Sequence, residues 1–208
     1  MQPVRTVCAY ERYTTQLALW NVKYEKYMLV HVQSLNSREL QGAALLKIHY
    51  TTAKIMFSTS ADPREISQTP KSTPAALERY DLHLDDFRLI VNLSRSLIMA
   101  TEQTAPECQT PLCFSGDLGL IGPLYYTCIR CPDESMRTIA MSLLRKSPRK
   151  EGMWDSVMIA QMIQQFWDLQ TDYPGPPEEF TDNGMVHFAY FGTSPEVAAN
   201  SSADLRLF

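Results

Sequence analysis

The sequence predicts an all-α fold, a multi-helix array of the α-superhelical or orthogonal kind, and two observations carry this prediction. Apolar residues recur at spacings of three and four over most of residues 1–172, which is the spacing of one helix face. Polar segments rich in proline, serine and threonine separate these stretches and have no such periodicity. We therefore expect residues 1–172 to form one helical domain.

The first two expected helices lie on either side of a capping motif. Asn36, with Glu39 three residues later, resembles a capping box that starts the second helix. In the first helix the residues that share one face are Tyr10, Tyr13, Leu17, Trp20, Tyr24 and Tyr27. The second helix has one stripe at Ala43, Leu46, Tyr50, Ala53 and Phe57 and another at Leu40, Ala44, Ile48 and Ile55. We expect it to be covered on most of its circumference.

Start and stop signals delimit the remaining helices. Acidic groups at a helix start complement the positive end of the helix dipole, and proline is tolerated in a first turn. The expected starts lie at Asp85 and Asp86, at Pro123, at Asp133, and at Asp155 or Ser156, and the expected ends lie at Pro132 and Pro148. The residues expected to face inward are Phe87, Ile90, Val91, Ser94, Leu97 and Ile98, then Met136, Ile139, Ala140, Leu143 and Leu144, then Ile159, Met162, Ile163, Phe166 and Leu169.

The pattern changes after the segment YPGPPEE. Residues 185–191 are apolar and aromatic, and residues 203–208 alternate, so the two stretches suit a small β-hairpin. We expect residues 173–208 to form a proline-rich breaker and this terminal hairpin, packed on the same domain.

Charge and composition narrow the function classes. The chain has 208 residues and a formal net charge of −4, whereas a domain that holds nucleic acid by itself is usually basic. DNA binding by this chain is therefore disfavoured. The sequence opens without an apolar signal-peptide core, and no stretch approaches the roughly 20 apolar residues that cross a bilayer. The five cysteines are irregularly placed, so we expect a soluble protein of a reducing, intracellular compartment.

The cysteine pairs raise the question of a metal site. Cys128 and Cys131 have the C-x-x-C spacing of a zinc knuckle, and Cys108 with Cys113 would supply the second pair. However, the C-x-x-C lies in a helix-like stretch, and free cysteine is a common buried small residue. We expect packed cysteines with no metal and no cofactor, and keep a structural zinc site as the alternative.

No catalytic motif is evident, and no catalytic residue is predicted. The chain contains no H-E-x-x-H, no G-x-S-x-G and no glycine-rich phosphate loop. No histidine lies three or four residues from another among His31, His49, His83 and His187. The carboxylates of Asp81, Asp85 and Asp86 are explained by a solvated helix start.

Residues 145–150, RKSPRK, form a basic cluster at an expected helix end. The cluster has the S-P-x-K form of a proline-directed kinase site and also suits a nuclear-import or phosphate-binding patch. The local interpretation is that Arg145 and Lys146 complement the negative end of the helix dipole. We favour the local interpretation, and the others stay open.

Residues 116–156 resemble the C-terminal regulatory region of fungal transcription factors of the binuclear zinc-cluster class. In that family the segment begins with Pro-Leu followed by two aromatic residues, and a basic residue next to a cysteine comes after them. A helix that ends in Leu-Leu follows. The segment ends with Pro-Arg-Arg-Glu-Gly, an aliphatic residue and Trp-Asp-Ser. The matching residues here are Pro123, Leu124, Tyr125 and Tyr126, then Arg130 and Cys131, then Leu143 and Leu144, and finally Pro148, Arg149, Glu151, Gly152, Trp154, Asp155 and Ser156. Weaker similarity covers residues 42–59 and 80–98.

Two features depart from the family. The chain lacks the six-cysteine, basic DNA-binding cluster of the class, and Lys150 replaces the usual second arginine. The resemblance implies a nuclear regulatory domain that binds a protein partner, a second copy or an effector, and reaches DNA only indirectly or through a missing N-terminal module. The residues it assigns to structure or interaction are Pro123, Leu124, Tyr125, Arg130, Cys131, Arg149, Glu151, Gly152, Trp154 and Asp155. A helical scaffold with enzymatic or small-molecule-binding activity is the alternative.

Overall fold

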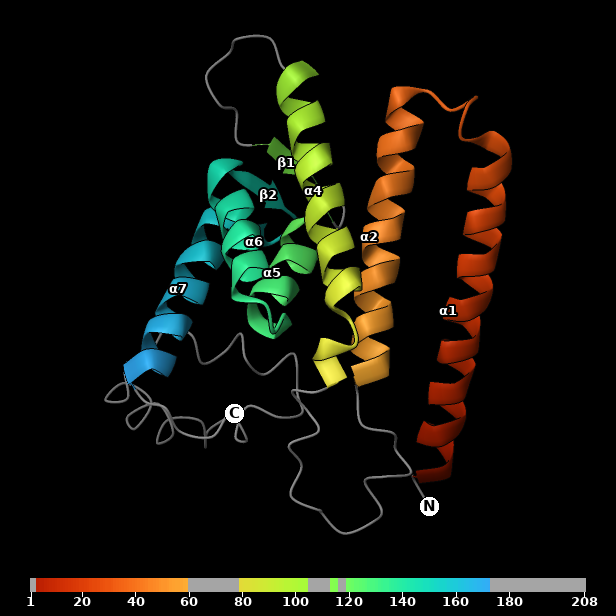
Figure 1. The fold of residues 1–208 in the computed structure, drawn as a ribbon, viewed down its shortest axis with the longest axis horizontal. Helices are drawn as coiled ribbons and strands as arrows, with labels where there is room; N and C mark the ends of the chain where they lie inside the picture. The colour runs from red at the N-terminus through yellow and green to blue at the C-terminus, as the bar shows by residue number, and fades with distance from the viewer. Residues whose placement is uncertain (1–2, 60–78, 105–112, 116–118, 173–208) are drawn as a thin grey trace, which may run out of the picture. The chain divides into compact units, whose positions relative to one another are not determined.

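The computed structural model describes residues 3–59, 79–104, 113–115 and 119–172 (Figure 1). The chain divides into two compact units, Met1–Ile163 and Gln164–Phe208. Nearly all of the described elements belong to the first unit, and the described part of the second is the end of one helix. The predicted breaker and terminal hairpin at 173–208 lie outside the described residues.

Helices dominate the described residues, which confirms the predicted all-α class. The helices are α1 (Pro3–His31), α2 (Ser37–Thr59), α4 (Leu84–Thr104), α5 (Ile121–Arg130), α6 (Glu134–Lys146) and α7 (Ser156–Asp172). In the first unit α1, α2 and α4 run side by side, and α4 also packs against α5 and α6 (Figure 1). None of the described helices is long and apolar enough to cross a membrane.

Helix α1 packs on α2 through aromatic rings and their hydroxyls. The Trp20 ring stacks on the Tyr50 ring with a centroid separation of 5.1 Å. The Tyr24 hydroxyl donates a hydrogen bond to the Ala43 carbonyl at 2.9 Å. Hydroxyls that meet backbone carbonyls satisfy the polar end of each tyrosine while its ring stays in apolar contact. The predicted aromatic stripe of α1 is therefore the face that contacts α2.

Several residues of the predicted apolar stripes are exposed, namely Tyr13 and Tyr27 of α1, Leu40 and Leu46 of α2, and Leu169 of α7. Because α1 docks along one side of α2, residues at the margins of that contact keep access to solvent. The expectation that α2 is covered on most of its circumference is therefore wrong at Leu40 and Leu46. Ile48 and Ile55, on the other predicted stripe, are fully buried.

The core of the first unit forms where α2, α4, α5 and α6 meet. Its members combine predicted apolar positions with others that the pattern missed, among them Thr51, Thr127 and Met141. The threonine hydroxyls donate to the carbonyls of the preceding turn, Thr51 to Lys47 and Thr127 to Pro123, so these two buried hydroxyls are satisfied. The Ser94 hydroxyl of α4 and His49 Nε2 of α2 are also buried and have no hydrogen-bond partner among the described residues. The largest fully buried side chains include Ile48, Ile55, Phe87, Ile90, Ile121, Leu124, Leu144, Ile159 and Ile163.

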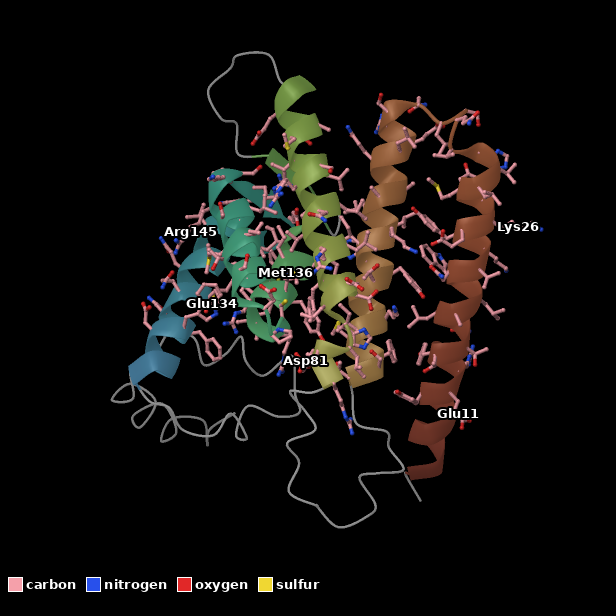
Figure 2. The ribbon with its side chains drawn as sticks, in the orientation of Figure 1. Glu11, Lys26, Asp81, Glu134, Met136 and Arg145 are labelled. Atoms are coloured by element: carbon pink, nitrogen blue, oxygen red, sulfur yellow. The ribbon has the colours of Figure 1, made fainter. Side chains whose placement is uncertain are left out.

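Local capping residues start the helices where the sequence predicts. The Asn36 side chain accepts from the Glu39 amide at 3.0 Å, and the Glu39 carboxylate accepts from the Asn36 amide at 2.8 Å, which is the reciprocal capping box. Asp133 caps α6 by accepting from the Met136 amide at 2.9 Å. Figure 2 shows Met136 at the start of this helix, where its side chain is buried.

Replacing Asp133 with alanine should lower the free energy of unfolding by about 1 kcal/mol, because the Met136 amide loses its acceptor. Asp133→Asn keeps an acceptor oxygen and should be close to neutral. Urea denaturation of the three proteins measures both effects. Equal destabilisation by alanine and asparagine would contradict the assignment of this residue as a cap.

A small three-stranded sheet, which the sequence pattern did not predict, interrupts the helical array. Its strands are β1 (Cys113–Ser115), β2 (Arg149–Glu151) and β3 (Trp154–Asp155), in the order β1-β2-β3. Strand β1 pairs parallel to β2, and β2 pairs antiparallel to β3. Gly152 has φ of +58°, which suits glycine, in the tight turn between β2 and β3. Strands of two or three residues are too short to produce a recognisable alternation.

Candidate functional site

The Glu151 carboxylate of β2 joins the beginning and the end of the segment that resembles the family, since it contacts the start of α5. Its Oε1 accepts from the Leu120 amide and its Oε2 from the Ile121 amide, each at 2.8 Å. These amides open α5, where helical N–H groups have no partner in their own helix and the dipole favours an anion. The Glu151 side chain is only 7% exposed. A residue 30 positions later in the chain therefore caps α5.

Gly119 leaves the space that this carboxylate occupies. A Cβ built on Gly119 would lie 2.2 Å from Glu151 Oε1 and 2.4 Å from Glu151 Cδ. Side-chain atoms do not approach that closely, so any larger residue at this position would displace the carboxylate. Sequence reasoning missed Gly119, because nothing local distinguishes it from other loop glycines.

Arg149 ties the end of α6 to the same sheet. Its Nη2 donates to the Ser147 hydroxyl at 2.6 Å, and its Nε donates to the Ser147 carbonyl at 3.3 Å. Its Nη1 lies 4.0 Å from Glu151 Oε1. The Arg149 amide donates to the Ser156 hydroxyl at 3.0 Å, which links β2 to the start of α7. Arg149 therefore ties the end of α6 to β2 and α7, while Arg145 and Lys146 lie in the last turn of α6, where the local interpretation places them.

The closing residues of the motif start α7 and cover α5. The Asp155 carboxylate accepts from the Val157 and Met158 amides at 3.0 and 3.2 Å, so it caps α7 as predicted. The Trp154 ring lies 6.2 Å from the Tyr125 ring, between centroids, in a tilted arrangement. Burial raises the pKa of the Tyr125 phenol. We name the assembly of Tyr125, Arg149, Glu151, Gly152, Trp154 and Asp155 the motif cluster.

The remaining motif residues serve packing in and beside α5. Pro123, Leu124 and Cys131 are buried. The Arg130 guanidinium lies 5.9 Å from the centroid of the Tyr80 ring, a cation–π contact with the turn before α4. The motif residues thus hold α5, the sheet and neighbouring segments together.

The C-x-x-C pair is packed rather than open. Cys128 and Cys131 are both buried free thiols, and the Cys128 sulfur lies 3.7 Å from the Arg137 carbonyl oxygen. Among the described side chains no group of three or more His, Cys, Asp and Glu residues converges as a metal site requires. The side chains of Cys108 and Cys113, the other pair of the zinc alternative, are outside the described part.

Cys128 and Cys131 should resist alkylation in the folded protein. Burial raises the pKa of Cys128 to about 12 and that of Cys131 to about 11, so the reactive thiolate is scarce at mildly alkaline pH. We expect iodoacetamide to modify both thiols quickly in denaturant and slowly in native buffer, as measured by peptide mass spectrometry. Fast native modification at Cys128 would show that α5 and α6 open locally.

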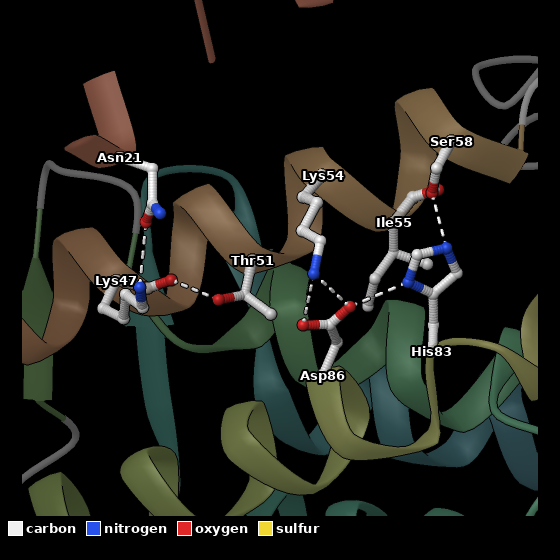
Figure 3. Close-up of polar contacts among 8 residues, drawn as sticks. All are labelled: Asn21, Lys47, Thr51, Lys54, Ile55, Ser58, His83 and Asp86. Carbon is white, nitrogen blue, oxygen red and sulfur yellow. Dashed lines mark hydrogen bonds and ion pairs between the residues drawn. The ribbon is translucent and has the colours of Figure 1, made fainter. Parts of the chain in front are cut away.

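A second set of polar side chains joins α2 to the start of α4, and Figure 3 shows it in close-up. The Lys54 ammonium donates to both Asp86 oxygens, at 2.9 and 2.8 Å. His83 Nδ1 lies 2.7 Å from Asp86 Oδ2, and His83 Nε2 lies 2.6 Å from the Ser58 hydroxyl oxygen. We name Lys54, Ser58, His83 and Asp86 the α2–α4 polar cluster.

Sequence reasoning missed this cluster. Asp85 is 95% exposed on its side chain, as a solvated helix start predicts, whereas the Asp86 side chain is 19% exposed and fully engaged. The solvated interpretation is therefore wrong for Asp86. The three-residue spacing of His83 and Asp86 was the available signal, but Ser58 lies 25 residues before His83 and gives none.

Lys47 makes a similar tie between α1 and α2. Its ammonium donates to the Asn21 side-chain oxygen at 3.0 Å (Figure 3) and pairs with Glu25. It also lies 5.3 Å from the ring centroids of Tyr24 and Tyr50. Lys47 therefore packs among aromatic rings and joins the two helices by charge and hydrogen bonding together.

The side of α1 away from α2 carries exposed apolar residues. Leu29 is 84% exposed, and Leu19, Val22 and Val30 are also exposed. Their spacing places them along one side of the helix, and Figure 2 shows Lys26 pointing outward from it. We name Leu19, Val22, Leu29 and Val30 the outer face of α1.

Comparison of the chain with models of known families, with curated proteins and with solved structures finds no match. The resemblance to the fungal regulatory region therefore depends on the quoted residues alone.

Proposed function

We propose that this chain is a regulatory and interaction domain of the fungal binuclear zinc-cluster type, which controls transcription in the nucleus by binding a protein partner or a second copy. One observation supports the assignment. Within the motif cluster, Glu151 caps α5, Trp154 packs on Tyr125, and Gly152 forms the turn between them. Tyr125 and Trp154, matched residues from the two ends of the resembling segment, are therefore in contact.

The outer face of α1 suits the interaction role. Exposed apolar side chains that gather on one side of a protein often mark a site where another protein binds, and Leu19, Val22, Leu29 and Val30 share one side of α1. Each fully buried leucine or valine side chain contributes roughly 1.5–3 kcal/mol through the hydrophobic effect. The net charge of −4 fits a domain that reaches DNA through another module rather than by its own surface.

A tethering experiment tests the proposal. The chain is fused to a heterologous DNA-binding module, and reporter transcription is compared with that of the module alone. We expect the fused chain to change reporter output. Val22→Glu with Leu29→Glu should abolish the change, because a buried partner contact would then contain two carboxylates. Lys23→Glu, an exposed charge change on the same helix, is the matched control and should retain it.

An unchanged reporter with a folded, nuclear fusion protein would reject the regulatory role. Light scattering on the purified chain shows whether the outer face of α1 binds a second copy of the chain or a different protein. A dimer that dissociates on Leu29→Glu indicates a second copy, and a monomer with reporter activity indicates a different partner.

The alternative class, a helical scaffold with catalytic activity, is favoured by one observation. Ser58, His83 and Asp86 converge at the contact between α2 and the start of α4. Converging titratable groups are the feature that distinguishes an active site from a packing surface.

A further inference from the structure

We propose that Ser58 is an activated serine nucleophile that accepts an acyl group from small activated esters. His83 acts as its general base, and Asp86 is the positioning residue for the imidazole. The proposal is independent of the regulatory function, since it concerns other residues and a different measurement.

The atoms of the α2–α4 polar cluster stand in the order that this chemistry requires (Figure 3). The imidazole presents Nε2 to the Ser58 hydroxyl at 2.6 Å and Nδ1 to the Asp86 carboxylate at 2.7 Å. An ionised carboxylate only accepts hydrogen bonds, so Nδ1 carries the proton. In the neutral imidazole the lone pair on Nε2 then accepts the Ser58 proton. A nucleophile paired with a base, and a base oriented by a third group, define an activated hydroxyl.

The alternative acceptor for the Ser58 proton is more distant. Within α2 the hydroxyl also lies 3.1 Å from the Ile55 carbonyl oxygen, the backbone contact common for serine in a helix. The distance from the Ser58 hydroxyl oxygen to His83 Nε2 is 2.6 Å, which is 0.5 Å shorter than the 3.1 Å to the Ile55 carbonyl oxygen. Hydroxyl hydrogen bonds are strongest near the shorter of these distances, so the geometry favours donation to the imidazole.

Exposure in the cluster decreases from the nucleophile to its partners. Ser58 is exposed, whereas the side chains of His83 and Asp86 are 12% and 19% exposed. A substrate in solution therefore reaches the hydroxyl, while the imidazole and carboxylate are shielded. Lys54 holds both oxygens of Asp86 and fixes the carboxylate against rotation.

The reaction follows the two steps of acyl transfer. Ser58 Oγ attacks the ester carbonyl carbon while its proton moves to His83 Nε2. The carbon–oxygen bond to the leaving group breaks, and the departing alkoxide takes that proton. In the second step water attacks the acyl-serine with the same base, which releases the carboxylic acid and restores the hydroxyl. The sum is ester plus water giving acid plus alcohol, with no redox change.

The competing interpretation is a purely structural tie between α2 and the start of α4. It predicts that substitutions in the cluster lower stability and leave Ser58 as unreactive as any surface serine. Ser96 of α4 is the internal reference, because it is exposed and its hydroxyl also donates to its own helix, to the Asn92 carbonyl.

The test uses the full chain and a fluorophosphonate probe, which reacts with activated serines as fluoride leaves the phosphorus. Intact mass and peptide mapping locate the label, and p-nitrophenyl acetate hydrolysis reports turnover. We expect one label on Ser58, none on Ser96, and none after Ser58→Ala. His83→Gln should slow labelling about 100-fold or more, the usual contribution of a general base. Lys54→Gln releases the Asp86 carboxylate and should slow labelling, by less than His83→Gln does. Glu102→Ala, an exposed change elsewhere on α4, is the control and should keep the rate.

Three outcomes would overturn the proposal: an unlabelled wild-type protein, equal labelling of Ser58 and Ser96, or an unchanged rate in a folded His83→Gln protein. If His83→Gln does not fold, the site of the label in the wild-type protein decides by itself. A lower melting temperature in Lys54→Gln and His83→Gln with no labelling in any variant would assign the cluster to structure alone.

Discussion

Glu151→Ala should destabilise the first unit by about 3 kcal/mol, because two buried amides at the start of α5 lose their acceptor together. The Leu120 and Ile121 amides both donate to this carboxylate, and both residues are buried, so water does not easily replace it. The favourable interaction of an anion with the helix dipole is lost as well. Chemical denaturation followed by circular dichroism measures the change in the free energy of unfolding.

Two further variants make this result specific. Glu151→Gln keeps one acceptor oxygen but places an amide donor near the other backbone N–H. Its free energy of unfolding should therefore lie between those of the wild-type and Glu151→Ala proteins. Glu102→Ala removes an exposed glutamate of α4 and should change stability by less than about 0.5 kcal/mol. Similar stability of the Glu151→Ala and Glu102→Ala proteins would contradict the capping role of Glu151.

Gly119→Ala should destabilise the protein by a comparable amount, about 2–3 kcal/mol, since the new methyl group occupies the position of the Glu151 carboxylate. The built Cβ lies 2.2 Å from Oε1, so the carboxylate must leave its two amide donors. The matched control is Gly122→Ala in the same region, where a Cβ meets nothing within 4 Å. Alanine is the better helix former, so this control should be neutral or stabilising by roughly 0.5–1 kcal/mol.

A double-mutant cycle joins the two predictions. Once Glu151 is alanine, the obstacle to a side chain at Gly119 is gone, so Gly119→Ala should add little further cost. The two losses should therefore be strongly non-additive, with a coupling energy of about 2 kcal/mol, as expected for residues in direct contact. Additive losses would show that Gly119→Ala acts through the backbone rather than through the carboxylate.

The sequence determined the helices and their local caps. Helical periodicity depends on residues three and four apart, and a cap such as Asn36 with Glu39 or Asp133 with Met136 spans three residues, so both are visible without a tertiary fold. The same holds for the buried face of α4, where Phe87 and Ile90 point inward as the pattern predicts. The residues that resemble the family motif were also recognisable along the chain.

Only the tertiary structure decided how these elements meet. In the sheet, Cys113 pairs with Arg149, which lies 36 positions later in the chain. These strands are too short to show an alternation of apolar and polar residues. Glu151 caps α5 from 30 positions away, and Ser58 meets His83 across 25. Such contacts depend on how helices pack, so no local propensity indicates them. Helices follow from the local sequence, whereas the buried Glu151 carboxylate and the contact of Ser58 with His83 exist only where packing brings distant polar groups together.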